Sequence, residues 1–436
     1  MRVKMNYGKS GLFIDFPDSW DIAVIEKPTM PILADSAGAV LKALADPVAS
    51  GPLAKEAAGR RTACILICDI TRPVPNSVIL TPLIRELIQA GIEPNAITVL
   101  VATGLHRPNE GEELRELVGS DWVLETVNVV NHFARRDEDH AYLGNTSRGT
   151  PVKLDRRFVE ADVKIATGLV EPHFMAGYSG GRKVVAPGIA HQDTITTFHN
   201  AGFLEHPRSD NCILEGNPLH EELTEVVRML GRVLAANAVI DDKRNLSYVN
   251  FGEIEASHLE AVAYMRRYAE IPVHTKYQTV ITSGGGYPLD QTYYQTVKGM
   301  VGAMAMIEPG GNIIIFSECS EGMGSKEYVN AQRLLRQLGV RGFRESLLHK
   351  SRASIDEWQT EMQLKPMEIG KIHLFSDKLS EVDRSLTGVH CPDDGISPLD
   401  FIRGIVEPSG TSIAVIPEGP YVIPRYENAS MAKGVR

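Results

Sequence analysis

The sequence predicts an α/β protein built from two α/β domains, with an active-site cleft between them. Three observations support this prediction. Short apolar segments alternate with segments of helical periodicity, the alternation restarts in the second half, and 436 residues are enough for two to three domains. Each predicted strand ends where the sequence turns polar or glycine-rich, and such sheets bind ligands at the carboxyl ends of their strands.

The first half contains four short, nearly continuous apolar segments, which we interpret as strands. They are Arg61–Asp69, Ala96–Thr103, Val123–Asn131 and Asp162–Gly168. Between the first two, Pro75–Gly91 has helical periodicity and ends at a glycine, which is a typical stop signal. Strands that are apolar throughout and joined by a helix are typical of a parallel sheet covered on both faces.

The same pattern restarts after residue 271. We predict strands at Thr279–Ser283, Asn312–Ser317, Lys371–Ser376 and Ser412–Ile416, and a helix from about Leu289 through Ala305. The domain boundary is therefore placed between residues 268 and 276. Residues 1–270 form the N-terminal cofactor-binding domain, residues 275–407 form the C-terminal domain, and the proline-containing segment 408–436 is expected to pack back on the first domain.

Composition excludes several classes of protein. The chain has 45 Lys and Arg against 55 Asp and Glu, and the resulting net charge of −10 argues against a nucleic-acid partner. The longest apolar stretches, such as residues 96–105, are shorter than the roughly 20 residues that a membrane span needs, and the N-terminus lacks the apolar core of a signal peptide. Five scattered cysteines do not suggest a disulfide framework. We therefore expect a cytoplasmic enzyme that does not bind membranes.

Polar side chains follow the first two predicted strands. Asp69 and Arg72 lie in DITRP after the first strand, and His106 lies in TGLHR after the second. Arginine offers a planar fork suited to carboxylate or phosphate, and a histidine there can act as acid or base near neutral pH. A structural loop with an Asp–Arg pair and a hydrogen-bonded histidine is the competing interpretation.

The segment after the fourth predicted strand carries the most reactive side chains. It reads GLVEPHFMAGYSGGRKVVAPG and places Glu171, His173, Ser179, Arg182 and Lys183 within thirteen residues. Glycines let backbone N–H groups approach an anion, and Ser, Arg and Lys complete a phosphate-binding loop. It is not a Walker A loop, because Arg182 occupies the position of the glycine before the lysine. A buried lysine among cations can instead serve as a nucleophile or a covalent tether.

A further histidine, His199, follows sixteen residues after Lys183. Together with His106 and His173 it either ligates a metal or leaves the other two as bases. The spacing does not match an HExxH helix, and the chain has no CxxC pair, so a standard zinc site is not indicated.

A glycine-rich segment at residues 283–290 begins the second half of the site. It fails the dinucleotide fingerprint because Leu289 stands where a third glycine is required. Gln295 and Lys298 follow at a spacing of three, so they share a helix face and can both reach the cleft. A solvated helix face is the competing interpretation.

Taken in this order, these segments resemble the nickel-dependent lactate racemase family. The resemblance rests on DITRP, GLHR, EPHFMAGYSGGRK followed by APG, the later His199, and GYPLDQTYYQTVKG. It extends from about residue 10 to 425, and the block around EPH and SGGRK is long enough to be highly specific. The family's fold, two α/β domains around a cleft, agrees with the fold that the periodicity predicts.

The resemblance implies a cofactor, the nickel-pincer nucleotide, which is a pyridinium mononucleotide that holds nickel through one carbon and two sulfurs. In the family, the lysine matching Lys183 tethers the cofactor and the histidine matching His199 binds nickel. The histidines matching His106 and His173 act as opposed acid/bases. The other matching positions divide into two groups. Those expected to contact the cofactor are Asp69, Ser179, Gly180 and Arg182. Those expected to contact the substrate are Arg72, Tyr294, Gln295, Lys298 and Trp358.

The implied reaction is racemisation or epimerisation of a short 2-hydroxy acid by reversible hydride transfer, with cofactor-synthesis proteins as partners. Lactate is one candidate, and longer or acidic 2-hydroxy acids such as malate are others. Two further hypotheses stand beside it. One is a divalent-metal-dependent hydrolase or isomerase that uses His106, His173 and His199, and the other is a non-catalytic protein that binds a nucleotide or a hydroxy acid.

Overall fold

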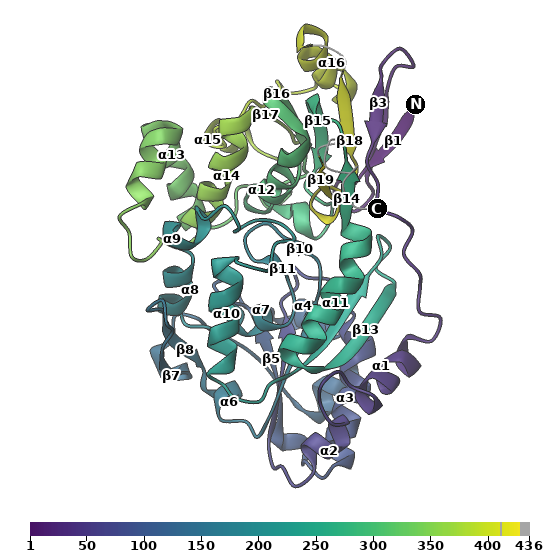
Figure 1. The fold of residues 1–436 in the computed structure, drawn as a ribbon, viewed down its shortest axis with the longest axis vertical. Helices are drawn as coiled ribbons and strands as arrows, with labels where there is room; N and C mark the ends of the chain where they lie inside the picture. Colours follow the sequence, from purple (N-terminus) through teal and green to yellow (C-terminus); the bar gives the residue numbers. More distant parts are fainter. Residues whose placement is uncertain (410–411, 428–436) are drawn as a thin grey trace, which may run out of the picture.

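The computed structural model describes residues 1–409 and 412–427, and it contains two sheets flanked by helices (Figure 1). The first sheet lies in the lower part of the figure and the second in the upper part. The predicted α/β class with two domains is confirmed.

The first sheet has six strands in the order β13-β12-β9-β4-β5-β6. Their bounds are β4 (Ala63–Cys68), β5 (Ile97–Ala102), β6 (Asn128–Asn131), β9 (Val163–Leu169), β12 (Leu234–Ile240) and β13 (Leu246–Glu253). All neighbouring pairs are parallel except β12 with β13. Strand β4 is buried on both faces, as its continuous apolar sequence predicts.

Helices cover both faces of this sheet. The helices of this part of the chain are α1 (Ser36–Ala45), α2 (Leu53–Ala57), α3 (Asn76–Gln89), α4 (Gly111–Val118), α5 (Asp121–Thr126), α6 (Arg156–Val159), α7 (Arg182–Val185), α8 (Gln192–Phe198), α9 (Ala201–Leu204), α10 (Pro218–Arg228) and α11 (Ile254–Ala269). Helix α3 buries Leu83 and Leu87, which confirms the helix predicted there.

The predicted strand Val123–Asn131 is wrong in its first half. Residues Asp121–Thr126 form α5, and only Asn128–Asn131 form strand β6. The Ser120 side chain accepts a hydrogen bond from the backbone N–H of Val123 and so caps this helix. This N-cap favours a helix over these apolar residues, which their composition alone does not predict.

The second sheet has five parallel strands in the order β17-β16-β15-β18-β3. Their bounds are β3 (Ile22–Val24), β15 (Tyr277–Ser283), β16 (Ile307–Phe316), β17 (Lys371–Phe375) and β18 (Ile413–Ile416). Four of these are the strands that the sequence predicts. The helices beside them are α12 (Tyr293–Gly302), α13 (Lys326–Leu347), α14 (Glu357–Ile369), α15 (Glu381–Leu386) and α16 (Pro398–Ser409).

The ends of the chain differ from the predicted domain boundaries. Strand β3 pairs with β18, so residues Ile22–Val24 belong to the second sheet rather than to the first domain. Strand β18 lies inside the second sheet, and β19 (Ile423–Tyr426) pairs with β14 (Glu270–Val273) at the boundary. The predicted return of residues 408–436 to the first domain is therefore wrong for β18, and residues 428–436 lie outside the described residues.

Short hairpins and 3-10 turns complete the chain. The hairpins pair β1 (Arg2–Met5) with β2 (Leu12–Asp15), β7 (His140–Asn145) with β8 (Pro151–Asp155), and β10 (Pro172–His173) with β11 (Gly177–Tyr178). The turns are η1 (Pro94–Ala96), η2 (Asp137–Asp139), η3 (Leu289–Gln291), η4 (Met304–Met306) and η5 (Gly419–Tyr421). The helix predicted from Leu289 through Ala305 is thus three pieces, and the Thr292 side chain caps the middle one, α12, by accepting from the N–H of Gln295.

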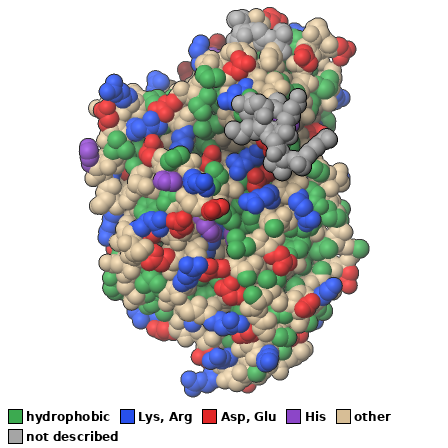
Figure 2. All heavy atoms as spheres, in the orientation of Figure 1, with side chains coloured by type: hydrophobic (Ala, Val, Ile, Leu, Met, Phe, Trp, Pro, Cys, Tyr) green, Lys and Arg blue, Asp and Glu red, His purple; other side chains and the backbone are tan. Residues whose placement is uncertain are grey.

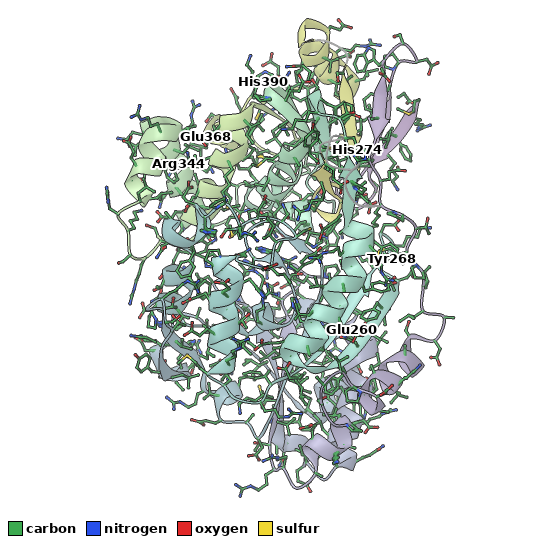
Figure 3. All side chains as sticks on the ribbon, viewed as in Figure 1. Glu260, Tyr268, His274, Arg344, Glu368 and His390 are labelled. Atoms are coloured by element: carbon green, nitrogen blue, oxygen red, sulfur yellow. The ribbon has the colours of Figure 1, made fainter. Side chains whose placement is uncertain are left out.

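One of the hydrophobic clusters spans both domains. A single cluster of buried residues contains Leu66 of β4, Val297 of α12 and Ile315 of β16. Helices α13 and α14 form a projection beside α12, where Arg344 of α13 and Glu368 of α14 form an ion pair (Figure 3). The shared core fixes α12 and α14 over the carboxyl ends of the first sheet.

The surface in Figure 2 intersperses acidic and basic side chains, as the nearly balanced composition predicts. Among the described residues, no helix combines the length and apolar character that crossing a bilayer would require.

Candidate active site

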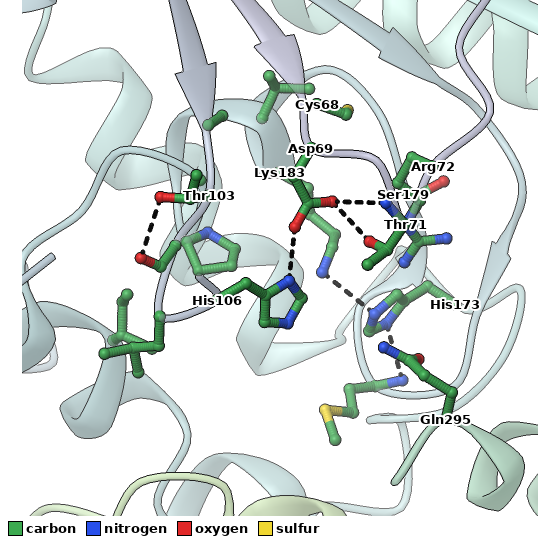
Figure 4. A pocket seen from close by; sticks show the side chains of 18 of the residues that line it. Cys68, Asp69, Thr71, Arg72, Thr103, His106, His173, Ser179, Lys183 and Gln295 are labelled. Atoms are coloured by element: carbon green, nitrogen blue, oxygen red, sulfur yellow. Dashed lines mark hydrogen bonds and ion pairs between the residues drawn. The ribbon is translucent and has the colours of Figure 1, made fainter. Parts of the chain in front are cut away.

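A pocket lies at the carboxyl ends of β4, β5 and β9 and is closed from the other domain by α12 and α14 (Figure 4). Nearly every residue predicted for the site lines it. These are Asp69, Arg72, His106, His173, Ser179, Gly180, Lys183, His199, Tyr294, Gln295, Lys298 and Trp358. The strand ends of one domain and the helices of the other therefore bring together side chains up to 289 residues apart in sequence, from Asp69 to Trp358.

His106 is paired with a carboxylate. Its Nδ1 lies 2.6 Å from Asp69 Oδ2, and Asp69 Oδ1 accepts a second hydrogen bond from Thr71 Oγ1 at 2.6 Å. Removal from bulk water favours the neutral ring, but the Asp69 charge and hydrogen bond outweigh it and raise the pKa of His106. The contact with Asp69 fixes the ring with Nε2 free for a ligand.

His173 has the opposite surroundings. The backbone N–H groups of Met175 and Ala176 both point at its Nδ1 from 3.2 Å, which places the proton of the neutral ring on Nε2. Nε2 lies 3.1 Å from Lys183 Nζ. Burial, together with nearby cations, lowers the pKa of His173 well below its usual value. The ring is therefore neutral near pH 7.

Lys183 points into the pocket from the one-turn helix α7. Burial and the neighbouring guanidinium groups lower its pKa well below the usual lysine value. The Nε2–H of His173 then donates to a neutral amine, which agrees with the direction of both shifts. Gly180, with φ of 75°, turns the chain before α7, and a side chain there would come within 2.7 Å of Val170 Cγ2. Only glycine fits this close approach.

Arg182 is the one predicted site residue that does not line the pocket. Its guanidinium lies 3.0 Å from His258 Nε2 and donates to the Ala176 carbonyl at 2.7 Å. Adjacent helical residues point about 100° apart, so when Lys183 enters the pocket Arg182 must leave it. The guanidinium of Arg182 holds the loop that carries His173, and its contact with a cofactor stays a prediction.

The pocket is rich in basic side chains. Arg72 forms an ion pair with the buried Glu171 carboxylate, and burial together with Arg72 and Lys183 lowers the pKa of Lys298 well below its usual value. An anionic ligand group can pair with these side chains and relieve the cost of packing them together. Ser179 lies nearby, but its hydroxyl donates to the Leu169 carbonyl at 2.7 Å and mainly fixes the loop.

His199 presents a metal-ligating tautomer. Its Nδ1 donates to the Ile195 carbonyl at 2.9 Å, which leaves the Nε2 lone pair free. Burial lowers its pKa to about 3, so the ring is neutral. Trp358 stacks on it with ring centroids 4.6 Å apart, and the indole N–H donates to Tyr294 Oη at 2.9 Å.

The three pocket histidines do not form a metal site by themselves. Within residues 1–409 and 412–427, no group of three or more His, Cys, Asp or Glu side chains is placed to hold a metal ion. The geometry therefore does not support the hypothesis in which His106, His173 and His199 jointly bind a divalent metal.

Asp356 lines the pocket just before α14, although no sequence motif predicts it as a site residue. Its backbone has φ of 63°, in the left-handed region that few non-glycine residues adopt. Burial raises the pKa of its carboxyl. No motif surrounds it, so only the fold brings it to the site. Thr71, which lies in the DITRP motif, was also not singled out.

Fold and pocket together define a two-domain α/β enzyme with an interdomain site that contains two histidines with opposite pKa shifts and a buried lysine. Residues 7–211 match the family described as "Lactate racemase N-terminal domain", and residues 273–423 match "Lactate racemase C-terminal domain". The chain belongs to the lactate racemase family, and it is an isomerase of the racemase class.

Relatives and solved structures agree with this assignment. A lactate racemase of Thermoanaerobacterium thermosaccharolyticum is 31% identical over 434 residues, which are 97% of this chain and 99% of that protein. One of Lactiplantibacillus plantarum is 34% identical over 290 residues, or 66% and 68% of the two chains. The lactate racemase apoprotein structure from T. thermosaccharolyticum has a TM-score of 0.88 at 30% identity, covering 98% of this chain and 100% of that one.

A more distant structure shows the same fold. A protein from Thermotoga maritima has a TM-score of 0.68 at 17% identity, and the match covers 90% of this chain and 98% of that one. This second similarity concerns the fold alone.

Proposed function

We propose that this chain racemises or epimerises a 2-hydroxy acid such as lactate, using a nickel-pincer nucleotide tethered to Lys183 with nickel bound by His199. One observation carries the proposal. Two histidines with opposite pKa shifts line a single pocket on either side of Lys183, as Figure 4 illustrates. A reaction that exchanges the two faces of one carbon needs an acid and a base that can exchange roles.

The residues in the pocket fit this cofactor. Lys183 has a low pKa and offers a neutral amine for a covalent bond. His199 offers a free Nε2 lone pair, because its Nδ1 is engaged by the Ile195 carbonyl. No set of described residues encloses a metal on its own, which suits a metal whose remaining ligands come from a cofactor. Held by Lys183 and His199, such a cofactor would supply a reversible hydride acceptor beside the substrate carbon.

Two basic side chains and Gln295 would orient the substrate. Arg72 supplies a planar fork for a carboxylate, and Lys298 supplies a second basic group, which a bound carboxylate would hold in its charged form. Both lie on elements fixed by packing, the end of β4 and helix α12. A carboxylate held at two points leaves the adjacent carbon free to rotate and present either face.

His106 and His173 would move the proton. The neutral member of the pair takes the hydroxyl proton as hydride leaves the carbon, which gives a planar 2-keto acid. The protonated member supplies a proton to the oxygen when hydride returns to the other face. Because Asp69 raises the pKa of His106, the resting proton of the pair lies on His106.

The proposal includes partners and a location. A lysine amine can attach the cofactor but cannot make it, so cofactor-synthesis proteins are required. The location is cytoplasmic, in agreement with five cysteines that all remain free thiols.

The test is racemisation of L-lactate in D2O by protein made together with the cofactor-synthesis enzymes, followed by proton NMR and chiral separation. Hydride transfer predicts formation of D-lactate that retains its C2 hydrogen. Racemisation with complete deuterium incorporation at C2 would show proton abstraction instead and would contradict the proposal.

A further inference from the structure

A second cavity of about 310 Å³ adjoins the catalytic pocket. The two share one wall, which is formed by Asp69, Thr71, Leu105, His106, Tyr294, Gln295 and Asp356. A ligand atom that reaches His106 and Gln295 from the catalytic pocket is therefore next to this cavity. The methyl group of lactate would leave most of such a volume unfilled.

The far walls of this second cavity carry several polar side chains, set among a lining that is mostly apolar. Beyond the shared wall they present hydroxyl, amide and charged groups, from Arg107, Asn109, Gln291, Thr292, Glu321 and Ser325. Such a lining offers both hydrogen-bond donors and acceptors. An apolar substituent would remove these groups from water without replacing their hydrogen bonds, which is unfavourable.

The charge of the cavity is negative. Arg107 is neutralised by Glu113, which accepts two hydrogen bonds from its guanidinium at 2.7 Å each. In the described part of the chain, neither Asp356 nor Glu321 forms an ion pair with a Lys, Arg or His side chain. Asp356 accepts a hydrogen bond from Ser325 Oγ at 2.5 Å. A second carboxylate on the substrate would therefore face two carboxylates.

Asp356 is held at the shared wall by its backbone. It has φ of 63° immediately before helix α14, and such left-handed non-glycine residues concentrate at functional sites. The carboxylate can only accept hydrogen bonds when ionised, so it favours a partner with donors. Hydroxyl groups supply donors and can also accept from Thr292 and Gln291.

We propose that the second cavity binds the side chain of the substrate and selects 2-hydroxy acids whose side chain carries several hydroxyl groups. Acids with a second carboxylate are disfavoured by Asp356 and Glu321, and small apolar acids leave the cavity unused. This inference rests on the proposed function and names its substrate class. On such a substrate the reaction is epimerisation at C2, with the other stereocentres unchanged.

The experiment compares gluconate, lactate and malate as substrates of the cofactor-loaded enzyme, by kcat/KM for C2 inversion. The inference predicts that gluconate is used at least about tenfold better than malate, because one charge-assisted hydrogen bond corresponds to about that factor. It also predicts that gluconate is used better than lactate. Equal or better use of malate or lactate would overturn it.

The variant Asp356→Asn gives the sharper test, because it makes opposite predictions for two substrates. The ratio of kcat/KM for gluconate over malate should fall about tenfold, with malate improving as the repulsion is removed. If Asp356 had only a structural role, the substitution would lower kcat/KM equally for all three substrates and leave their ratios unchanged, which would contradict the inference. Glu321→Gln, at an exposed position, should shift the ratio in the same direction by less.

Asp210→Asn is the matched control, because burial also raises the pKa of the Asp210 carboxyl but the residue does not line either cavity. Its substrate ratios should equal those of the unsubstituted chain. Different results would contradict the substrate class and the proposed function. Inversion of lactate or malate in preference to gluconate defeats only this inference, whereas no inversion of any 2-hydroxy acid by nickel-loaded protein defeats the proposed function.

Discussion

His106 and His173 line one pocket, but their partners differ in kind. His106 faces the carboxylate of Asp69, whereas His173 faces two backbone N–H groups and the amine of Lys183. The same imidazole therefore has its pKa raised at one place and lowered at the other. The difference shows that the fold, and not the residue type, assigns the proton within the pair.

This asymmetry originates in two loop types. Asp69 and His106 follow neighbouring parallel strands, β4 and β5, so their side chains meet at one sheet edge. His173 lies in the small β10–β11 hairpin, where backbone N–H groups turn inward. A carboxylate stabilises the imidazolium, and inward N–H groups stabilise the neutral ring. The predictions below test this contrast, from the largest expected effect to the smallest.

Replacing either histidine by alanine should lower kcat by about 10²–10⁴-fold in both directions, since in the proposed reaction each direction uses one histidine to take a proton and the other to supply one. Rates from each pure enantiomer, with nickel content measured in parallel, provide the check. Nickel should remain bound, because neither residue is its proposed ligand. A His173→Ala enzyme that racemises at the original rate would remove His173 from the mechanism.

Asp69→Asn should lower the pKa of His106 and reduce kcat by about 10²-fold, because the imidazolium loses its countercharge. NMR titration of His106 gives the pKa. Asp162→Asn is a suitable control, since that exposed carboxylate binds backbone N–H groups of Arg61 and Thr62 far from the pocket. An unchanged pKa of His106 in Asp69→Asn would contradict the assigned cause.

The same pair predicts a pH-dependent stability. The folded-state pKa of His106 is raised, so its contribution is fully present below the unfolded value of about 6.5 and is lost as the pH rises through the folded value. The Tm difference between the original chain and Asp69→Asn should therefore shrink as the pH rises from 6 to 9. A difference that grows over this range would reverse the sign of the coupling.

Lys298→Ala should lower kcat/KM by about 10–100-fold, the value of one charge-assisted hydrogen bond to a carboxylate. Lys298 lies in the second domain, whereas both histidines lie in the first, so the substitution tests substrate orientation separately from proton transfer. His106 and His173 should keep opposite pKa shifts in this variant. A loss confined to kcat with an unchanged KM would place Lys298 in the chemistry rather than in carboxylate binding.

Glu171→Gln should have the smallest effect, a rise in KM of about threefold to tenfold. Glu171 pairs with Arg72, so its loss frees the guanidinium to move and costs part of one partly buried ion pair. Steady-state kinetics of both enantiomers measures the change. If KM falls, Glu171 competes with the substrate for Arg72 instead of positioning it.

The sequence predicted the parts of the fold that depend on local patterns. Strands β4, β5 and β9 are continuous apolar runs, and the motifs at their ends supply Asp69, His106 and Lys183. The sequence did not predict which sheet a short strand joins when this depends on pairing with a strand far away in the chain. Strand β3 has three residues, and only its pairing with β18 assigns it to the second sheet.

The same reason explains where the structure places two residues of the site. Arg182 and Lys183 are adjacent in one motif, but the helix directs them to opposite surroundings. Asp356 stands in no motif, and it reaches the pocket because the α13–α14 projection packs beside α12. Composition and spacing do not predict which way a side chain points or which helices pack together.

The most direct test of the account is the mass of the peptide that contains Lys183, combined with the nickel content of the protein from its native source. The account predicts a nucleotide adduct on Lys183, about one nickel per chain, and an unmodified Lys298 as the internal control. A native protein with unmodified Lys183 and neither nickel nor nucleotide would contradict it.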